Sequence, residues 1–288
     1  MSRKEAFFAL DGRYRRLVDN LAYIRGEASR AYVPPPTSVP PELHDAFTMG
    51  GTIPIVDWYF NSKPDPKSIG SIVMYKASMI KQVRKDVLEG KYKSYGETND
   101  HLKAALQDFP IRGKNTLIFG SVYPQYEAFC LNAGAYPVTI EYNVRFSDSD
   151  EIAFFSPSQF DALGVKGDAA ISISSFEHDG LGRYGDPLDP DGDLKAMKKL
   201  LTQIDSGGLV FVSVPIGRDS LVWNAHRIYG HDRLPKLLSD WRVLACYGDP
   251  DRLIQIENES IAIDVDRWSS HFPLVRSARE WVFVLRAP

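Results

Sequence analysis

The pattern of apolar and polar positions changes near residue 114. Upstream, apolar residues recur at helical spacing with charged residues between them, which predicts amphipathic helices. The predicted helices span residues 3–31, about 69–88 and about 98–108. Five prolines between residues 34 and 41 end the first helix and favour a stiff, extended connection. Residues 52–60 form a short apolar and aromatic stretch, which suggests packing against the main domain or over a site. We therefore predict a helical N-terminal extension with a Pro-rich linker over residues 1–110.

From residue 114 onward, short β-rich apolar runs alternate with helical runs. A strand over residues 116–119, a helix over 125–132 and a strand over 136–140 form a β-α-β unit, whose strands we expect to be parallel with a right-handed crossover. Further strands are predicted over residues 152–155, 169–174, 209–214, 241–247 and 281–285. Seven strands, with a loop between the last two, predict an α/β, Rossmann-like domain over residues 111–288 with a mostly parallel seven-stranded sheet.

Two residues that end the first strand and one that ends the second are candidates for cofactor binding. Gly120 and Ser121 follow the first strand, and Glu141 lies 21 positions after Gly120. Rossmann-like folds place a carboxylate on a ribose hydroxyl at about this spacing. A dinucleotide fingerprint has three glycines where this chain has one, so a nicotinamide oxidoreductase is disfavoured. S-adenosylmethionine, which lacks a pyrophosphate, tolerates a looser turn. We therefore predict that these three residues bind S-adenosylmethionine; a carboxylate that only caps a strand edge is the alternative for Glu141.

The most polar stretch of the chain, residues 174–193, follows an apolar strand-like run. It gathers Glu, His, Arg, Tyr and Asp between glycines and prolines. A strand that runs into such a loop places ionisable groups at the carboxyl edge of the sheet, where open α/β sheets bind ligands. A solvated surface loop is the alternative, because Gly, Pro and Asp are also the commonest turn residues. We favour the interpretation that this loop lines a pocket.

His178 is the predicted general base in this loop, because an unperturbed imidazole titrates near neutral pH. A histidine hydrogen-bonded into the loop for structure is the alternative. Glu177 could orient it, although neighbours on a strand point to opposite faces. His226, in a second polar cluster over residues 223–233, is predicted to converge on the same edge. The residues predicted to bind substrate are Asp179, Arg183, Tyr184, Asn224, Arg227 and Tyr229. The two arginines suit a carboxylate or phosphate on the substrate, and the two tyrosines suit a sugar.

Four aspartates between residues 186 and 193 raise the possibility of a divalent metal, which takes clustered carboxylates. Asp193 is better explained as the cap of a following helix, and the run Asp-Pro-Asp-Gly before it as a turn. A divalent metal is therefore possible but not favoured, and we assign no metal ligands.

The composition of the chain limits the classes of partner that we expect. The formal net charge of −3 gives no general reason to expect nucleic acid or an anionic membrane as a partner. No stretch approaches the roughly 20 apolar residues of a membrane span. Cys130 and Cys246 lie in apolar surroundings without metal-ligand spacing. We expect a soluble, cytoplasmic protein that acts on a small-molecule substrate, and the sequence leaves its oligomeric state open.

Three segments resemble the uncharacterised family catalogued as domain of unknown function 268. They are SSFEHDGLGRYGDP at residues 174–187, VPIG at residues 214–217 and NAHRIYG at residues 224–230. The likeness spans about residues 114–244, and it implies a Rossmann-like methyltransferase fold without an established substrate.

More distantly, residues 117–120, Glu141 and the strand that ends at Ser175 and Phe176 are similar to successive landmarks of class I methyltransferases. This resemblance adds Ser175 and Phe176 to the predicted cofactor-binding residues. The chain departs from that pattern in the glycine-rich loop, of which only Gly120 remains. The prediction is an S-adenosylmethionine-dependent methyltransferase on a small polar acceptor, with O-methylation of a sugar or related metabolite as one form. A catalytically inactive binding or partner protein of the same fold is the alternative.

Overall fold

The computed structural model describes residues 34–60, 73–142, 145–272 and 278–288. The predicted helix over residues 3–31 lies outside the described residues. The chain divides into two compact units. Among the described residues, the first comprises residues 73–142, 145–172 and 203–209, and the second comprises residues 34–60, 173–202, 210–272 and 278–288. The boundary that we predicted at residue 110 lies inside the first unit, so part of the predicted extension belongs with the strands that follow it.

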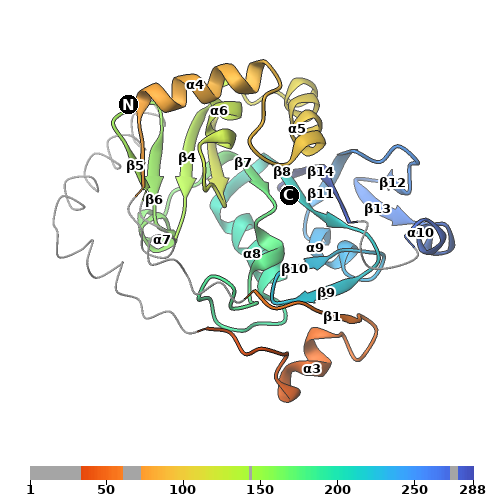
Figure 1. Ribbon diagram of the computed structural model, residues 1–288. Helices are drawn as coiled ribbons and strands as arrows, with labels where there is room; N and C mark the ends of the chain where they lie inside the picture. Colours follow the sequence, from red (N-terminus) through yellow and green to blue (C-terminus); the bar gives the residue numbers. More distant parts are fainter. Residues whose placement is uncertain (1–33, 61–72, 143–144, 273–277) are drawn as a thin grey trace. The chain divides into compact units, whose positions relative to one another are not determined.

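Seven strands form one sheet in the order β11-β14-β8-β7-β3-β4-β6 (Figure 1). Their bounds are β3 Asn115–Phe119, β4 Tyr136–Ile140, β6 Ala153–Phe155, β7 Gly167–Ile173, β8 Ile204–Ile216, β11 Arg242–Tyr247 and β14 Arg279–Arg286. β3 pairs in parallel with both β4 and β7, and β4 pairs in parallel with β6. β11 and β14 pair antiparallel. The predicted fold class, a mostly parallel seven-stranded α/β sheet, is therefore confirmed.

The strand order reverses at β3. From this strand the sheet extends through β4 to β6 on one side and through β7 to β8 on the other. In a doubly wound sheet such a reversal is a topological switch point, and ligands bind outside the carboxyl ends of the strands there. The side chains of Leu117 and Ile118 in β3 are fully buried, as expected for a parallel strand covered on both faces. The residues that follow β3 and β4 therefore lie where this type of sheet binds ligands.

The helices of the first unit include α4 (Ala77–Leu88), α5 (Gly96–Asp108), α6 (Gln125–Asn132) and α7 (Pro157–Leu163). The predictions of α5 and α6 are confirmed, but the helix predicted from residue 69 begins later. A short strand, β2 (Val73–Tyr75), precedes α4 and pairs in parallel with β5 (Arg145–Ser147). Tyr75 is buried, with its ring edge-on to that of Phe154 at a centroid distance of 5.6 Å. Strand pairing and burial of Tyr75 thus override the helical spacing at this point.

The second unit contains a small three-stranded sheet, β1-β9-β10. β1 (Ile55–Asp57) pairs in parallel with β9 (Ser220–Trp223), which pairs antiparallel with β10 (His226–Ile228). The helix α3 (Pro41–Phe47) brings the ring of Phe47 to 5.4 Å from that of Trp223. The aromatic run at residues 52–60, expected to pack against the main domain, supplies an edge strand of this sheet.

The remaining elements of the described chain are the 3₁₀ helix η1 (Phe176–His178), α8 (Gly192–Gln203), α9 (Leu234–Leu238), the hairpin of β12 (Ile254–Glu257) and β13 (Ser260–Ile263), and α10 (Val265–His271). None of the helices in the described part of the chain combines the length and apolar character needed to span a bilayer.

Candidate functional site

The chain leaves β7 through a strained residue. Ser174 follows the strand with a φ of 50°, in the left-handed region that residues with a side chain seldom adopt. The 3₁₀ helix η1 comes next. The alternation of strand residues that we expected to separate Glu177 from His178 therefore does not apply. Nε2 of His178 lies 3.4 Å from Oε1 of Glu177, so the two side chains belong to one cluster.

Two carboxyl groups meet at this turn. Glu177 is fully buried, and the Ser174 hydroxyl donates to its Oε1 at 2.5 Å. Among the described residues, Oε2 of Glu177 has no hydrogen-bond partner. Ser174 also hydrogen-bonds to Glu280 at the start of β14. Burial, with the nearby Glu280 charge, raises the pKa of Glu177 to about 8, and burial raises the pKa of Glu280 to about 7. At neutral pH, the pair Glu177 and Glu280 therefore keeps at least one proton.

His178 is held in one tautomer by the backbone. Its Nδ1 lies 2.6 Å from the carbonyl oxygen of Ala225. Since a carbonyl can only accept, we assign the hydrogen to Nδ1 and the free lone pair to Nε2. Arg183 donates to the same carbonyl at 2.9 Å. Burial, and then the Arg183 charge, lowers the pKa of His178 to about 3. The imidazole is therefore neutral at physiological pH and fixed in orientation.

His226, on β10, comes close to His178. The two rings are edge-on at a centroid distance of 6.4 Å. Burial, and then the Arg183 charge, lowers the pKa of His226. Within the described chain, its ring nitrogens take part in no hydrogen bond. The predicted convergence of the two histidines is confirmed, and His226 is the one whose lone pair is unused.

Arg183 lies between two aromatic rings. Its guanidinium carbon is 4.3 Å from the centroid of the Phe60 ring and 5.1 Å from that of Tyr184. Tyr184, predicted to bind substrate, is 57% exposed. The backbone N–H of Phe60 donates to Oδ1 of Asn224 at 2.8 Å. Asn224 is buried, and its Oδ1 positions Phe60, whereas among the described residues its Nδ2 has no hydrogen-bond partner. Its contact with substrate stays a prediction. Residue-by-residue reasoning missed Phe60, although the aromatic run around it was the available signal.

Two further predicted substrate ligands are engaged by the protein itself. Arg227 is buried and donates to the carbonyl oxygens of Glu177, Asp179, Asp189 and Pro190. Tyr229 is fully buried, and its hydroxyl donates to Asp193 at 2.8 Å. The prediction that Arg227 and Tyr229 contact substrate is therefore corrected: these side chains hold the loop in place.

The aspartates of the loop are also occupied. Asp186 accepts from the backbone N–H groups of Gly180, Gly182 and Tyr184. Asp189 pairs with Lys195 at 2.6 Å. The predicted helix cap is wrong, because Asp193 lies inside α8 and both its oxygens bond to Arg233. The predicted substrate ligand Asp179 follows η1, and burial followed by the Asp186 charge raises its pKa to about 7. Backbone amides or cations thus bond to the carboxylates of Asp186, Asp189 and Asp193.

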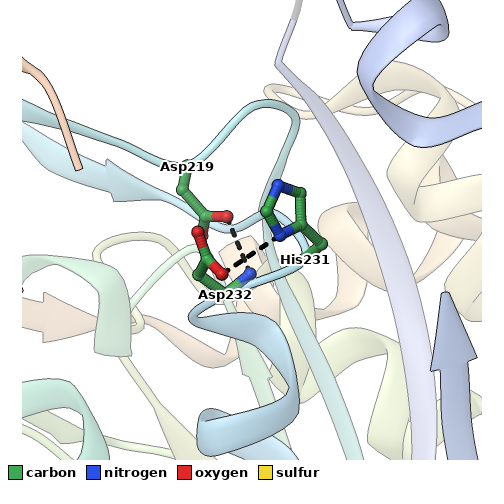
Figure 2. Close-up of side chains that lie close together, drawn as sticks. All are labelled: Asp219, His231 and Asp232. Carbon is green, nitrogen blue, oxygen red and sulfur yellow. Dashed lines mark hydrogen bonds and ion pairs between the residues drawn. The ribbon is translucent and has the colours of Figure 1, made fainter. Parts of the chain in front are cut away.

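A different trio has the spacing of metal ligands. Figure 2 shows Asp219, His231 and Asp232, whose potential ligand atoms lie within 4.8 Å of one another. The carboxylate of Asp219 accepts from the backbone N–H groups of Gly230, Asp232 and Arg233. Nδ1 of His231 lies 3.1 Å from Oδ1 of Asp232. Asp219 therefore shapes the turn before α9, and its role needs no ion.

Three of the residues predicted to bind the cofactor follow β3 and β4, in the first unit. Gly120 follows β3 with a φ of 69°, and Glu141 follows β4 at a half-buried position. Ser121 is fully buried. Its hydroxyl donates to Glu127 at 2.8 Å, and its carbonyl accepts from the hydroxyl of Tyr75 at 3.1 Å. The hydroxyl and the carbonyl of Ser121 therefore build the turn, and its contact with the cofactor stays a prediction.

Glu127, a fully buried carboxyl in α6, was not singled out from the sequence. It accepts from Ser121 and from Thr139 of β4 at 2.8 Å each. In the second unit, the predicted cofactor ligands Ser175 and Phe176 begin η1, where their carbonyls accept from His178 and Asp179. The side chain of Phe176 is buried.

Comparison with known proteins places the chain in a family. A family model described as Caenorhabditis protein of unknown function, DUF268, matches residues 113–276, more than half of the chain. No curated protein matches the sequence. Among solved structures, 1,6-didemethyltoxoflavin-N1-methyltransferase from Burkholderia thailandensis, with bound S-adenosylhomocysteine, is similar at a TM-score of 0.46 and 12% identity, over 81% of this chain and 93% of that one. Magnesium protoporphyrin IX methyltransferase from Synechocystis PCC 6803 is similar at a TM-score of 0.40 and 11% identity, over 70% of this chain and 86% of that one.

Proposed function

The chain belongs to the family of Caenorhabditis proteins of unknown function DUF268, and from that premise we propose that it is an S-adenosylmethionine-dependent methyltransferase acting on a small polar acceptor. The observation that carries the proposal is the switch point at β3. There Gly120, with a φ of 69°, opens the turn after β3, and Glu141 ends the neighbouring strand β4. A glycine at this turn allows close ligand approach, and a carboxylate at the end of the next strand suits the two hydroxyls of a ribose.

These residues fit an adenosine cofactor better than a dinucleotide. With one glycine in the turn, the backbone cannot wrap a pyrophosphate as a three-glycine fingerprint does. Gly120 and Glu141 are the residues that would hold S-adenosylmethionine. When bound, this cofactor supplies an electrophilic methyl group.

The second unit supplies groups for an acceptor. His226 is the proposed base: its imidazole is neutral because burial and Arg183 lower its pKa, and the described protein leaves its lone pair unused. His226 would accept the proton of an acceptor hydroxyl held within hydrogen-bond reach of its ring. His178, fixed by the Ala225 carbonyl, positions the His226 ring from the side. Glu177 holds His178 from the buried face.

The test is calorimetric titration of the whole chain with S-adenosylmethionine and S-adenosylhomocysteine. We expect both to bind and to raise the melting temperature. Glu141→Gln weakens binding about tenfold, because a charge-assisted bond to the ribose becomes a neutral one. Gly120→Ala weakens it as well, because a Cβ at this turn obstructs the close approach of the ligand.

Gly90→Ala is the matched control. Gly90 has a φ of 70° at the end of α4, with open space around it. Alanine at this φ lowers stability but leaves the affinity for both nucleosides unchanged. Absence of heat and of a thermal shift at millimolar ligand contradicts the proposed function.

A second candidate function is a binding or partner protein that has lost the cofactor. The observation that favours it is the closed turn after β3, where Ser121 bonds to Glu127 and Tyr75 instead of facing a ligand. Under this alternative, neither nucleoside gives heat, and Glu141→Gln leaves the melting temperature unchanged with and without them.

A further inference from the structure

Arg183 carries a positive charge that the described protein does not neutralise. Its guanidinium contacts the Ala225 carbonyl, the His178 ring and the rings of Phe60 and Tyr184, all of them uncharged. The other arginines of this region differ: Arg227 and Arg233 both form ion pairs with Asp193. The nearby Asp186 is bonded to three backbone N–H groups. A half-buried cation without a partner favours an anionic ligand.

The cation is also held in place before any ligand arrives. The three backbone bonds of Asp186 fix the turn on either side of Arg183, and the bond to Ala225 fixes its Nη1 atom. Asn224 fixes the backbone of Phe60, which supports the other side of the guanidinium. Because the planar guanidinium group of Arg183 is already ordered, it loses little side-chain entropy when it binds a carboxylate or phosphate.

Exposed aromatic faces surround this cation. Tyr184 is 57% exposed and Phe60 is 38% exposed, although both rings are large and apolar. The His178 ring is edge-on to Tyr184 at a centroid distance of 5.6 Å. Aromatic rings of this kind provide a flat, amphipathic surface on which a sugar ring can pack. The His226 ring, whose pKa is lowered by burial and by the Arg183 charge, is edge-on to the His178 ring at a centroid distance of 6.4 Å.

We propose that Arg183, Phe60 and Tyr184 form the acceptor site and that the acceptor is an anionic sugar, whose carboxylate or phosphate binds Arg183 while its ring packs on the two aromatic side chains. This substrate class rests on the proposed function. The methylated group is then a sugar hydroxyl that reaches His226. A neutral sugar leaves Arg183 without a counter-charge and binds poorly.

The experiment is calorimetric titration of the whole chain with glucuronate, glucose 6-phosphate and glucose, with S-adenosylhomocysteine titrated separately. We expect heat from at least one of the two anionic sugars and none from glucose at the same concentration. Binding of glucuronate alone assigns a carboxylate, and binding of glucose 6-phosphate alone assigns a phosphate. Arg183→Gln weakens the anionic sugar roughly tenfold to a hundredfold, the range expected for a lost charged hydrogen bond.

Two further variants separate recognition from folding. Arg183→Lys keeps the charge but loses the fork, so it retains part of the affinity that Arg183→Gln loses. Lys236→Gln removes the same charge from an exposed position of α9 in the same unit and leaves binding unchanged. Equal binding of glucose and the anionic sugars, or of the wild type and Arg183→Gln, overturns the inference. If S-adenosylhomocysteine binds and no anionic sugar does, only the inference fails; the reverse result overturns the proposed function and leaves the anion site standing.

Discussion

Glu177 illustrates how one residue depends on its surroundings. The same side chain on the surface would be a common carboxylate. Here it is fully buried, bonded to Ser174, and close to a second carboxyl, Glu280. Burial and the like charge favour its protonated form, so its pKa rises to about 8. The residue can therefore donate a hydrogen bond near neutral pH, which an ordinary glutamate cannot do.

This raised pKa predicts how stability depends on pH. Between the unfolded value of 4.5 and the folded value of about 8, the native state binds more protons than the unfolded state. The free energy of unfolding therefore falls as pH rises through this window and levels off above it. Glu177→Gln, which mimics the protonated form, reduces the slope, and Glu280→Gln does so too.

Urea unfolding at several pH values between 5 and 9 measures this effect. Glu257→Gln, at an exposed position of β12, is the matched control and keeps the wild-type slope. A slope that is the same in wild type and Glu177→Gln shows that the buried carboxyl does not hold its proton as argued.

At the scale of the elements, the loop between β7 and α8 is held in place by side chains from other segments of the chain. Arg227 of β10 donates to four of its carbonyls, and Arg233, just before α9, bonds to Asp193 in the first turn of α8. Asp193 is fully buried and is the shared counter-ion of the two arginines. Asp193 therefore supports the order of this loop through both arginines, in addition to the backbone bonds of Asp186 around Arg183.

Replacement of that carboxylate should therefore be costly. Asp193→Asn leaves two buried guanidinium groups without their counter-ion, and we expect a loss of about 3–5 kcal/mol of stability. Asp191→Asn is the control, because that carboxylate is 59% exposed and 3.7 Å from Arg233. Its loss costs under about 1 kcal/mol. Thermal unfolding of both variants decides the question, and equal melting temperatures count against this role of Asp193.

For the molecule as a whole, the two units are interleaved along the chain. The segment at residues 34–60 belongs to the second unit, and the chain then contributes residues 73–142 and 145–172 to the first. Phe47 of α3 packs on Trp223 of β9, 176 positions later in the sequence. The described segment at residues 34–60 is therefore part of a core, with Val39, Phe47 and Ile53 buried beside Trp223.

A point variant tests this conclusion. Phe47→Ala removes a ring that is 3% exposed, and the expected loss is about 3–5 kcal/mol of stability. Leu88→Ala, in α4, removes a large apolar side chain that is 64% exposed, and it costs far less. If chemical denaturation finds the two variants equally stable, the segment around Phe47 is an appendage after all.

Local patterns were sufficient for the sheet and its helices. The β-rich runs, the helix over residues 125–132 and the single glycine after β3 can be identified in short windows, because side-chain periodicity and turn residues are properties of neighbours in sequence. The convergence of His178 and His226 also followed from such reasoning, since both come after elements expected to end at one edge.

The roles of the side chains depend on contacts between segments that are distant in sequence. Arg227 and Tyr229 have the composition of a substrate site, yet they bond to backbone and to Asp193. Phe60 has only the aromatic run around it as a local signal, and both Phe60 and Glu280 reach the cluster because segments distant in sequence pack beside it.

The sequence by itself determined the seven strands of the large sheet and the helices α5 and α6, since hydrophobic spacing encodes them locally. Only the tertiary structure decided which polar groups are already satisfied and which, like Arg183 and His226, are left for a ligand. The physical reason is that a hydrogen bond or ion pair depends on distance in space, and partners lie up to 187 residues apart, as Trp223 and Pro36 do.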